Sequence, residues 1–135
     1  MQRDLNVAVL DGGVSPERDI SLLSGSAVLR GLSRAGWRAS EVDVDGNFED
    51  RIPELLAKKD ICFIALHGVY GEDGQVQKIL EDHSRPYTGS GPAASRAGMD
   101  KIASKNIFME HDVPTPAFRV LKSGAPVWDE EFPCV

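Results

Sequence analysis

Two short loops hold the residues that are best suited to chemistry. The segment "ALHGVYGEDGQ", residues 65–75, places His67, Glu72 and Asp73 among three glycines. The segment "DGGVSPERDIS", residues 11–21, places Glu17 and Arg18 after two glycines. Carboxylates accept hydrogen bonds from ammonium groups, and an imidazole can donate, accept or carry a proton. Both loops are therefore candidates for binding a small polar ligand.

Each of these residues also has a plainer structural interpretation. An exposed acid such as Glu17 near a helix start is commonly a favourable partner of the helix dipole. A single histidine such as His67 is more often a satisfied core residue than a catalytic one. We favour scaffolding roles for Glu72 and Asp73, since acids before a helix often cap it. Lys101, in the short sequence "MDK", is in isolation an ordinary surface lysine.

The first loop contains two glycines but matches neither of two common nucleotide-binding motifs. Gly12 and Gly13 permit backbone conformations that other residues avoid, and they allow close approach of a ligand. However, "DGGVSPER" lacks the G-x-G-x-x-G pattern of dinucleotide-binding folds, and no G-K-[ST] follows as in a P-loop. The loop must therefore act through side chains or through a different backbone geometry.

Composition narrows the class of protein. The 135 residues carry a net charge of −6, with 41% hydrophobic and 27% charged residues. Such an acidic chain is a poor match for nucleic acid, which needs a basic face. Cys62 and Cys134 do not form a disulfide framework or a metal site. We find neither a signal-peptide pattern nor an apolar run long enough to span a membrane, so a cytoplasmic protein is expected.

The elements that must position the loops alternate between strands and helices. Short apolar or alternating runs predict strands at residues 5–10, 38–44 and 60–66, with a shorter one at 85–91. Helical spacing predicts helices from Ile20 to about Gly36, at 51–59 and at 74–83. This alternation is typical of an α/β fold with an open, mostly parallel, Rossmann-like sheet and helices on both faces.

Two further predictions concern the first helix and the residues after Gly91. The first helix is expected to bury one apolar side, made of Ile20, Leu23, Ala27, Val28 and Leu32. After Gly91, residues 92–112 are expected to be helical in one or two segments, residues 117–121 to resemble a strand, and residues 134–135 to begin another.

The predicted sheet brings the two loops together. Ligands of open parallel sheets bind outside the carboxyl ends of the strands. Both loops follow predicted strands directly, so Glu17 and His67 are expected to face one cleft.

Taken in order, four stretches resemble one known family. They are "GGVSPERDISLLSG", "ALHGVYGEDGQVQ", "PYTGSGPAAS" and "MDK". Together they resemble the N-terminal part of D-alanine–D-alanine ligases, members of the ATP-grasp superfamily, from Val7 to about Val120. D-alanine–D-lactate ligases look similar here, so the second substrate stays open. "HGVYGEDG" argues against a different ATP-grasp ligase.

The resemblance implies a domain organisation and a reaction. Residues 1–98 would form the N-terminal pre-ATP-grasp substrate domain, and residues 99–135 the truncated start of the central ATP-grasp subdomain. Such ligases use ATP and Mg²⁺ to phosphorylate the carboxylate of one D-alanine, which the amine of a second then attacks, for peptidoglycan synthesis. The Mg²⁺ ligands would lie outside this chain, which would be inactive alone.

The resemblance also implies roles for three side chains. Glu17 would bind the ammonium of the first D-alanine within the catalytic site, His67 would lie beside its carboxyl group, and Lys101 would reach the ATP phosphates. A homodimer through this domain is implied as well. An alternative is a free-standing, non-catalytic binding or regulatory remnant of such a ligase. Asp11 departs from the family pattern, where an apolar residue or glycine is commoner.

Overall fold

The computed structural model describes residues 4–121 and contains a three-stranded parallel sheet. Strand β1 (Asn6–Gly12) lies in the centre, between β2 (Arg38–Val44) and β3 (Ile61–Ile64). The register pairs all of β1 with β2 and its residues 7–10 with β3, so that Val9 lies opposite Glu41 and Phe63. The predicted open parallel sheet is confirmed.

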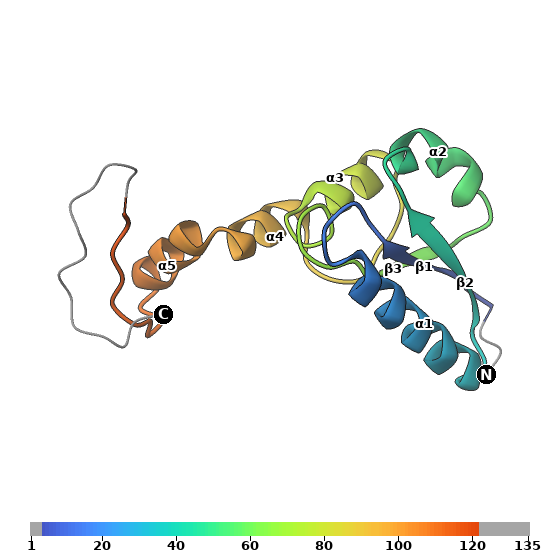
Figure 1. The fold of residues 1–135 in the computed structure, drawn as a ribbon, viewed down its shortest axis with the longest axis horizontal. Coiled ribbons are helices and arrows are strands. Elements are labelled where there is room, and N and C mark those ends of the chain that lie inside the picture. Colours follow the sequence, from blue (N-terminus) through green and yellow to red (C-terminus); the bar gives the residue numbers. More distant parts are fainter. Residues whose placement is uncertain (1–3, 122–135) are drawn as a thin grey trace.

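Five helices accompany the sheet within the described residues. They are α1 (Arg18–Arg34), α2 (Phe48–Leu55), α3 (Gln75–Asp82), α4 (Pro92–Met99) and α5 (Lys101–Glu110). Figure 1 shows α1 on one face of the sheet and α2 and α3 on the other, while α4 and α5 extend away from it. The predicted coverage of both faces is therefore confirmed.

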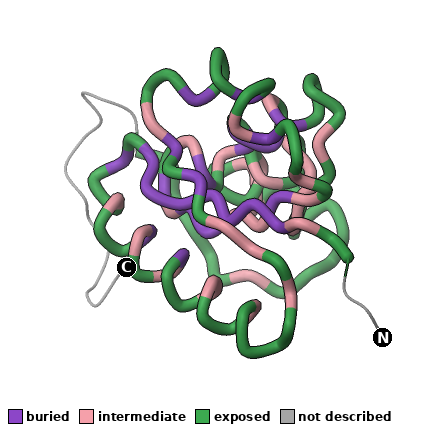
Figure 2. Tube along the Cα trace, turned by 90° about the vertical axis from the view of Figure 1, so that its right-hand side faces the viewer, coloured by how far each residue is buried: buried purple, intermediate pink, exposed green. Residues whose placement is uncertain are grey.

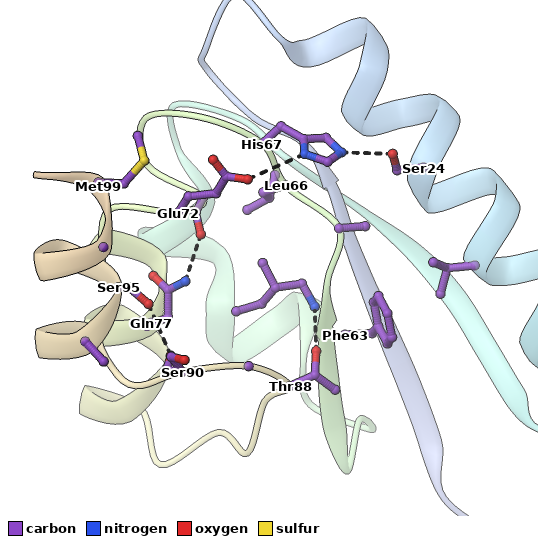
Figure 3. Close-up of a pocket in the computed structure, with 17 residues that line it drawn as sticks. Ser24, Phe63, Leu66, His67, Glu72, Gln77, Thr88, Ser90, Ser95 and Met99 are labelled. Atoms are coloured by element: carbon purple, nitrogen blue, oxygen red, sulfur yellow. Dashed lines mark hydrogen bonds and ion pairs between the residues drawn. The ribbon is translucent and has the colours of Figure 1, made fainter. Parts of the chain in front are cut away.

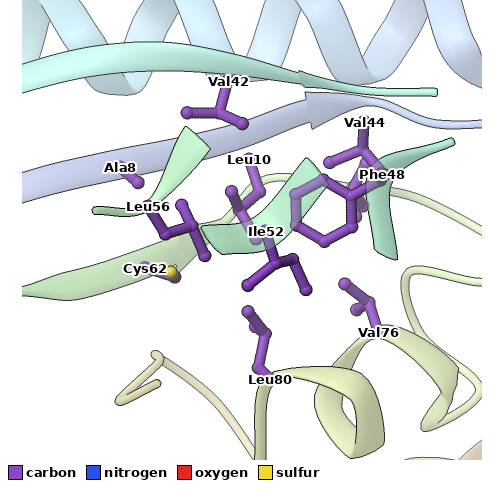
Figure 4. Close-up of a cluster of buried hydrophobic side chains, with 11 residues drawn as sticks. Ala8, Leu10, Val42, Val44, Phe48, Ile52, Leu56, Cys62, Val76 and Leu80 are labelled. Atoms are coloured by element: carbon purple, nitrogen blue, oxygen red, sulfur yellow. The ribbon is translucent and has the colours of Figure 1, made fainter. Parts of the chain in front are cut away.

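The larger part of the core lies between the sheet and the helices α2 and α3. Apolar side chains from both layers meet there, as Figure 4 shows: Ala8, Leu10, Val42, Val44, Phe48, Ile52, Leu56, Cys62, Leu66, Val76 and Leu80. Full burial of a Leu- or Phe-sized side chain stabilises a fold by about 1.5–3 kcal/mol. This layer therefore holds β1 and β3, whose ends carry the two loops, in fixed positions.

A smaller cluster lies under α1 on the opposite face. Val7, Val9 and Ala65 are buried there, against partly buried residues of α1 that include Val28 and Leu32. Because β1 is covered on both sides, its apolar residues do not alternate with polar ones. Figure 2 shows the buried residues gathered in this interior.

The first half of α1 differs from the prediction. Ile20 and Leu23 are 55% and 67% exposed, whereas Ser21 and Gly25 are the buried residues of this helix. The predicted apolar side was therefore wrong here. The reason is local: small residues let the helix approach the carboxyl ends of β1 and β3 closely, and the larger apolar side chains are left outside.

After Gly91 the chain forms two helices, α4 and α5, which is one of the two alternatives predicted for residues 92–112. Residues 85–91 form a single bridge, between Cys62 and Tyr87, rather than a full strand. Residues 117–121 form no strand, so that prediction was wrong. The predicted strand start at 134–135 and Cys134 lie outside the described residues. No helix in the described part is long and apolar enough to cross a membrane.

Candidate functional site

The two loops lie at the same edge of the sheet, since β1 and β3 are parallel neighbours. Hydrogen bonds join them directly. The Ser15 hydroxyl donates to the carbonyl oxygen of His67 at 2.9 Å, and the Ser21 hydroxyl donates to that of Ala65 at 2.9 Å. The first loop and α1 are thus fixed to the segment that carries His67.

The glycine turn after β1 is shaped by a close contact. Gly12 and Gly13 have φ values of 78° and 86°, in the left-handed region that favours glycine. A Cβ atom on Gly12 would lie 2.1 Å from Asp43 Oδ1 and 2.4 Å from Arg18 Nη1. Arg18 donates two hydrogen bonds to Asp43, at 2.8 and 2.6 Å, and these bonds lower the Asp43 pKa. The turn therefore lets Arg18 connect α1 to β2.

Glu17 is exposed at the start of α1 and lies against the His67 loop. A Cβ atom on Gly68 would be 2.1 Å from Glu17 Oε2, so a larger residue there would displace this carboxylate. The Glu17 side chain does not cap α1. Its backbone N–H donates to the Ser15 hydroxyl at 3.2 Å. The carboxylate therefore lies beside Gly68, the residue that follows His67, on an exposed side chain.

His67 lies between a hydroxyl and a carboxylate, as Figure 3 shows. Its Nε2 atom is 2.9 Å from Ser24 Oγ, and its Nδ1 atom is 3.7 Å from Glu72 Oε1. The side chain is 33% exposed, so it is not a fully buried core histidine. Both ring nitrogens have defined neighbours.

The two acids of the second loop brace it, as predicted. Glu72 Oε2 accepts a hydrogen bond from the backbone N–H of Gly68 at 3.1 Å. Asp73 accepts from the backbone N–H groups of Tyr70 and Gln75, at 2.9 and 3.1 Å. Burial acts to raise the Asp73 pKa, but these hydrogen bonds outweigh it and the pKa is lowered. The bond to Tyr70 supports a residue with a φ of 76°, which is strained for a side chain of this size.

An open pocket of about 660 Å³ lies next to this loop. Ser24, His67 and Glu72 line one side of it, and residues of the 88–90 turn and of α4 line the other. Glu17 does not line this pocket, although it lies beside the adjoining Gly68. The expectation that Glu17 and His67 face one cleft is therefore not met by this pocket, which His67 lines while Glu17 is an exposed carboxylate beside it.

Lys101 is not brought to this site. It is the exposed first residue of α5, whose N-terminus is capped by Asp100. Met99 is the last residue along the chain that lines the pocket. Within the described residues, the structure therefore joins the Glu17 and His67 loops and leaves Lys101 apart.

Three serines and one acid were missed by the sequence analysis. Ser15, Ser21 and Ser24 attach the first loop and α1 to the His67 loop. The sequence feature that could have identified two of them is the i, i+3 spacing of Ser21 and Ser24, which places both on one face of a helix. Asp11 is fully buried, and neither of its carboxylate oxygens has a hydrogen-bond partner within the described residues.

The described residues contain no group of three or more His, Cys, Asp or Glu side chains that could hold a metal ion. Mg²⁺ prefers oxygen ligands in near-octahedral geometry, usually with one or two carboxylates beside phosphate oxygens. Glu17 and Glu72 both lie beside Gly68, but no third such ligand accompanies them within the described residues. This part of the chain therefore does not fit a resident Mg²⁺ ion.

Known proteins resemble this chain over most of its length. The family model described as "D-ala D-ala ligase N-terminus" matches residues 39–90. A D-alanine–D-alanine ligase of Halorhodospira halophila is 49% identical over 129 residues, which are 96% of this chain and 41% of that protein. One of Bordetella petrii is 50% identical over 120 residues, 88% of this chain and 36% of that protein.

The chain matches the N-terminal part of D-alanine–D-alanine ligases. It spans about two fifths of the length of the curated ligases that it matches. A crystal structure of the Bacillus anthracis ligase complexed with ATP has a TM-score of 0.79 and 31% identity, and the match covers 91% of this chain and 42% of that one. The similarity therefore covers nearly all of this chain and the smaller part of its ligase relatives.

Proposed function

We propose that this chain supplies part of the first D-alanine site of a D-alanine–D-alanine ligase. The observation that carries the proposal is the contact of the Glu17 carboxylate with Gly68, next to His67. It places an acid and an imidazole at one edge of the sheet, where open α/β folds bind ligands. The match to the N-terminal part of such ligases, reached independently, supports the same assignment.

The chemistry of the two side chains matches a small zwitterion. D-alanine carries an ammonium and a carboxylate group separated by one carbon. The Glu17 carboxylate accepts hydrogen bonds and attracts the ammonium. The His67 side chain, on the residue before Gly68, would lie beside the carboxyl end of the same molecule. Glu17 and His67 would then fix the direction in which the substrate enters.

We propose that ATP and Mg²⁺ are used by the complete ligase rather than by this chain alone. Mg²⁺ would neutralise charge on the transferred phosphoryl group, using ligands from outside the described residues. Lys101, a compact point charge on a flexible stem, would contribute to the ATP phosphates. The proposed boundary between residues 1–98 and 99–135 lies next to Asp100, which separates α4 from α5 and caps α5.

We further propose a cytoplasmic homodimer that forms through this domain. Four large apolar side chains are more than half exposed near the site: Val14, Ile20, Leu23 and Val69. Exposed apolar groups of this kind are commonly covered by a partner surface. A measurement of molecular mass in solution over a range of concentrations tests this part separately.

The experiment is a domain exchange. The matching N-terminal segment of the Halorhodospira halophila ligase is replaced with this chain, and D-alanine-dependent phosphate release from ATP is measured. We expect activity, and we expect Glu17→Gln to raise the KM of the first D-alanine. Glu54→Gln, an exposed acid on α2 on the face of the sheet opposite α1, is the matched control.

Two results would overturn the assignment. An active hybrid whose kinetics do not change with Glu17→Gln would remove Glu17 from the site. A hybrid that folds but consumes no ATP with D-alanine would remove the function. Replacing the second D-alanine by D-lactate in the same assay separates the two ligase types.

A further inference from the structure

Ser24 lies at hydrogen-bond distance from the imidazole of His67. The two atoms, Ser24 Oγ and His67 Nε2, are 2.9 Å apart. On the other side of the ring, Nδ1 and Glu72 Oε1 are 3.7 Å apart, which is beyond a hydrogen bond but within ion-pair range. The ring is therefore placed between one group that can donate and one that can only accept (Figure 3).

This arrangement selects one neutral form of the ring. A neutral imidazole has one N–H donor and one acceptor nitrogen, and its neighbours decide which is which. The carboxylate of Glu72 attracts an N–H at Nδ1. Nε2 is then the acceptor, and the Ser24 hydroxyl donates to it.

We infer that Ser24 is a positioning residue for His67, which holds the ring in the Nδ1–H tautomer and in one orientation. The value of this for catalysis rests on the proposed D-alanine site, whereas the tautomer itself does not. A side chain that is already fixed loses less conformational entropy when a ligand binds. The pocket beside Ser24, His67 and Glu72 would thus meet its ligand with the imidazole already oriented.

Both neighbours of the ring are themselves fixed by the backbone. One turn before Ser24, the Ser21 hydroxyl attaches α1 to the carbonyl of Ala65. The residue after Ser24, Gly25, packs directly on Asp11 of β1. Opposite, the second oxygen of Glu72 is held by the N–H of Gly68. The hydroxyl and the carboxylate are therefore both carried by segments whose positions are fixed relative to His67.

The test is the ¹⁵N spectrum of the His67 ring in this chain, without ligand and at about pH 8, above the usual histidine range. We expect a pyrrole-type nitrogen at Nδ1 and a pyridine-type nitrogen at Nε2. In Ser24→Ala, the ratio of Nδ1–H to Nε2–H forms should fall about fivefold, which corresponds to the loss of one hydrogen bond of ordinary strength. Ser24→Thr keeps a hydroxyl and should restore the parent spectrum.

The matched control is Ser26→Ala on the same helix. Ser26 is exposed, and its hydroxyl oxygen accepts a hydrogen bond from Arg30 rather than contacting His67. The same substitution there should leave the ring nitrogens unchanged. A backbone amide spectrum confirms that each variant is folded.

Two outcomes overturn the inference: a protonated Nε2 in the parent chain, or a Ser24→Ala spectrum equal to that of the parent. Because no D-alanine is present, the result does not depend on the proposed function. D-alanine is then added to the same sample. Unchanged amide signals at Gly68 and its neighbours would contradict the proposed D-alanine site but not the inference about the His67 tautomer.

Discussion

Gly25 of α1 packs directly against Asp11 of β1: a Cβ atom on Gly25 would lie 1.9 Å from Asp11 Oδ2 and 2.6 Å from its Cβ. No real Cβ atom approaches another heavy atom so closely, and Asp11 is fully buried and has no room to move aside. The contact sets the distance between α1 and the sheet. Since α1 also carries Ser24 and follows Glu17, this distance decides where the site residues lie.

We therefore expect Gly25→Ala to lower the free energy of unfolding by about 1–3 kcal/mol, as overpacking in a dense core commonly does. Gly31→Ala in the same helix is the control, because a Cβ atom there meets nothing within 4 Å. It should stabilise the chain by about 1 kcal/mol through helix propensity alone. Chemical denaturation measures both. Equal effects of the two variants would show that α1 does not rest on Asp11.

The fold could be predicted from the sequence because its signals are local. The run of residues 38–44 gave β2 with the observed bounds, and Gly36 ended α1 in a left-handed conformation, with a φ of 80°. The apolar side of α1 could not be predicted in the same way. Helical spacing says which residues share a face, but not that the sheet edge accepts Ser21 and Gly25 there in place of Ile20 and Leu23.

The positions of the loop residues could be predicted from the sequence, but the contacts that join the loops could not. Glu17 and His67 follow from their places after two predicted strands, and the loop acids from their position before α3. The serines that join the two loops could not be predicted in this way. Each hydroxyl donates to a carbonyl oxygen 44 or 52 residues away, and the local sequence does not indicate such a contact. Whether Asp11 is buried or solvated depends likewise on how closely α1 approaches.

The pH dependence of stability should report on Asp11. Burial, followed by the charges of Glu41 and Asp43, raises its pKa from 3.8 to about 6. The folded chain therefore holds this proton where the unfolded chain has lost it, so stability falls as the pH rises from about 4 to 6 and stays lower above. The full effect is on the order of 3 kcal/mol, from the size of the pKa difference.

Asp11→Asn isolates this contribution, because other carboxylates titrate in both variants. Unfolding free energies of the parent and Asp11→Asn chains are compared between about pH 4 and pH 7. The difference should change in favour of the variant as the pH rises. Parallel curves for the two chains would mean that Asp11 titrates normally and is solvated.

Ser21 should contribute to stability through its buried hydrogen bond. Its side chain is 1% exposed, and its hydroxyl donates to the carbonyl oxygen of Ala65 at 2.9 Å. Ser21→Ala removes the donor and leaves that contact unmade, which typically costs about 1–2 kcal/mol. Ser26→Ala, on the exposed side of the same helix, should change the unfolding free energy by less than about 0.5 kcal/mol. Thermal or urea unfolding of the two variants distinguishes a buried tether from a general effect of serine in the helix.

Cys62 should be chemically inert until the chain unfolds. Its side chain is 1% exposed in the core between β3 and α2, and burial raises the pKa of the thiol to about 11. The thiolate is the reactive form, so a raised pKa and lack of access both slow alkylation. In a Cys134→Ser background, iodoacetamide at about pH 8 should label Cys62 only at the rate of local or global opening. That rate should rise in Gly25→Ala if labelling requires global unfolding. Rapid labelling of the folded parent would contradict the burial of β3, and with it the strand that carries His67 to the site.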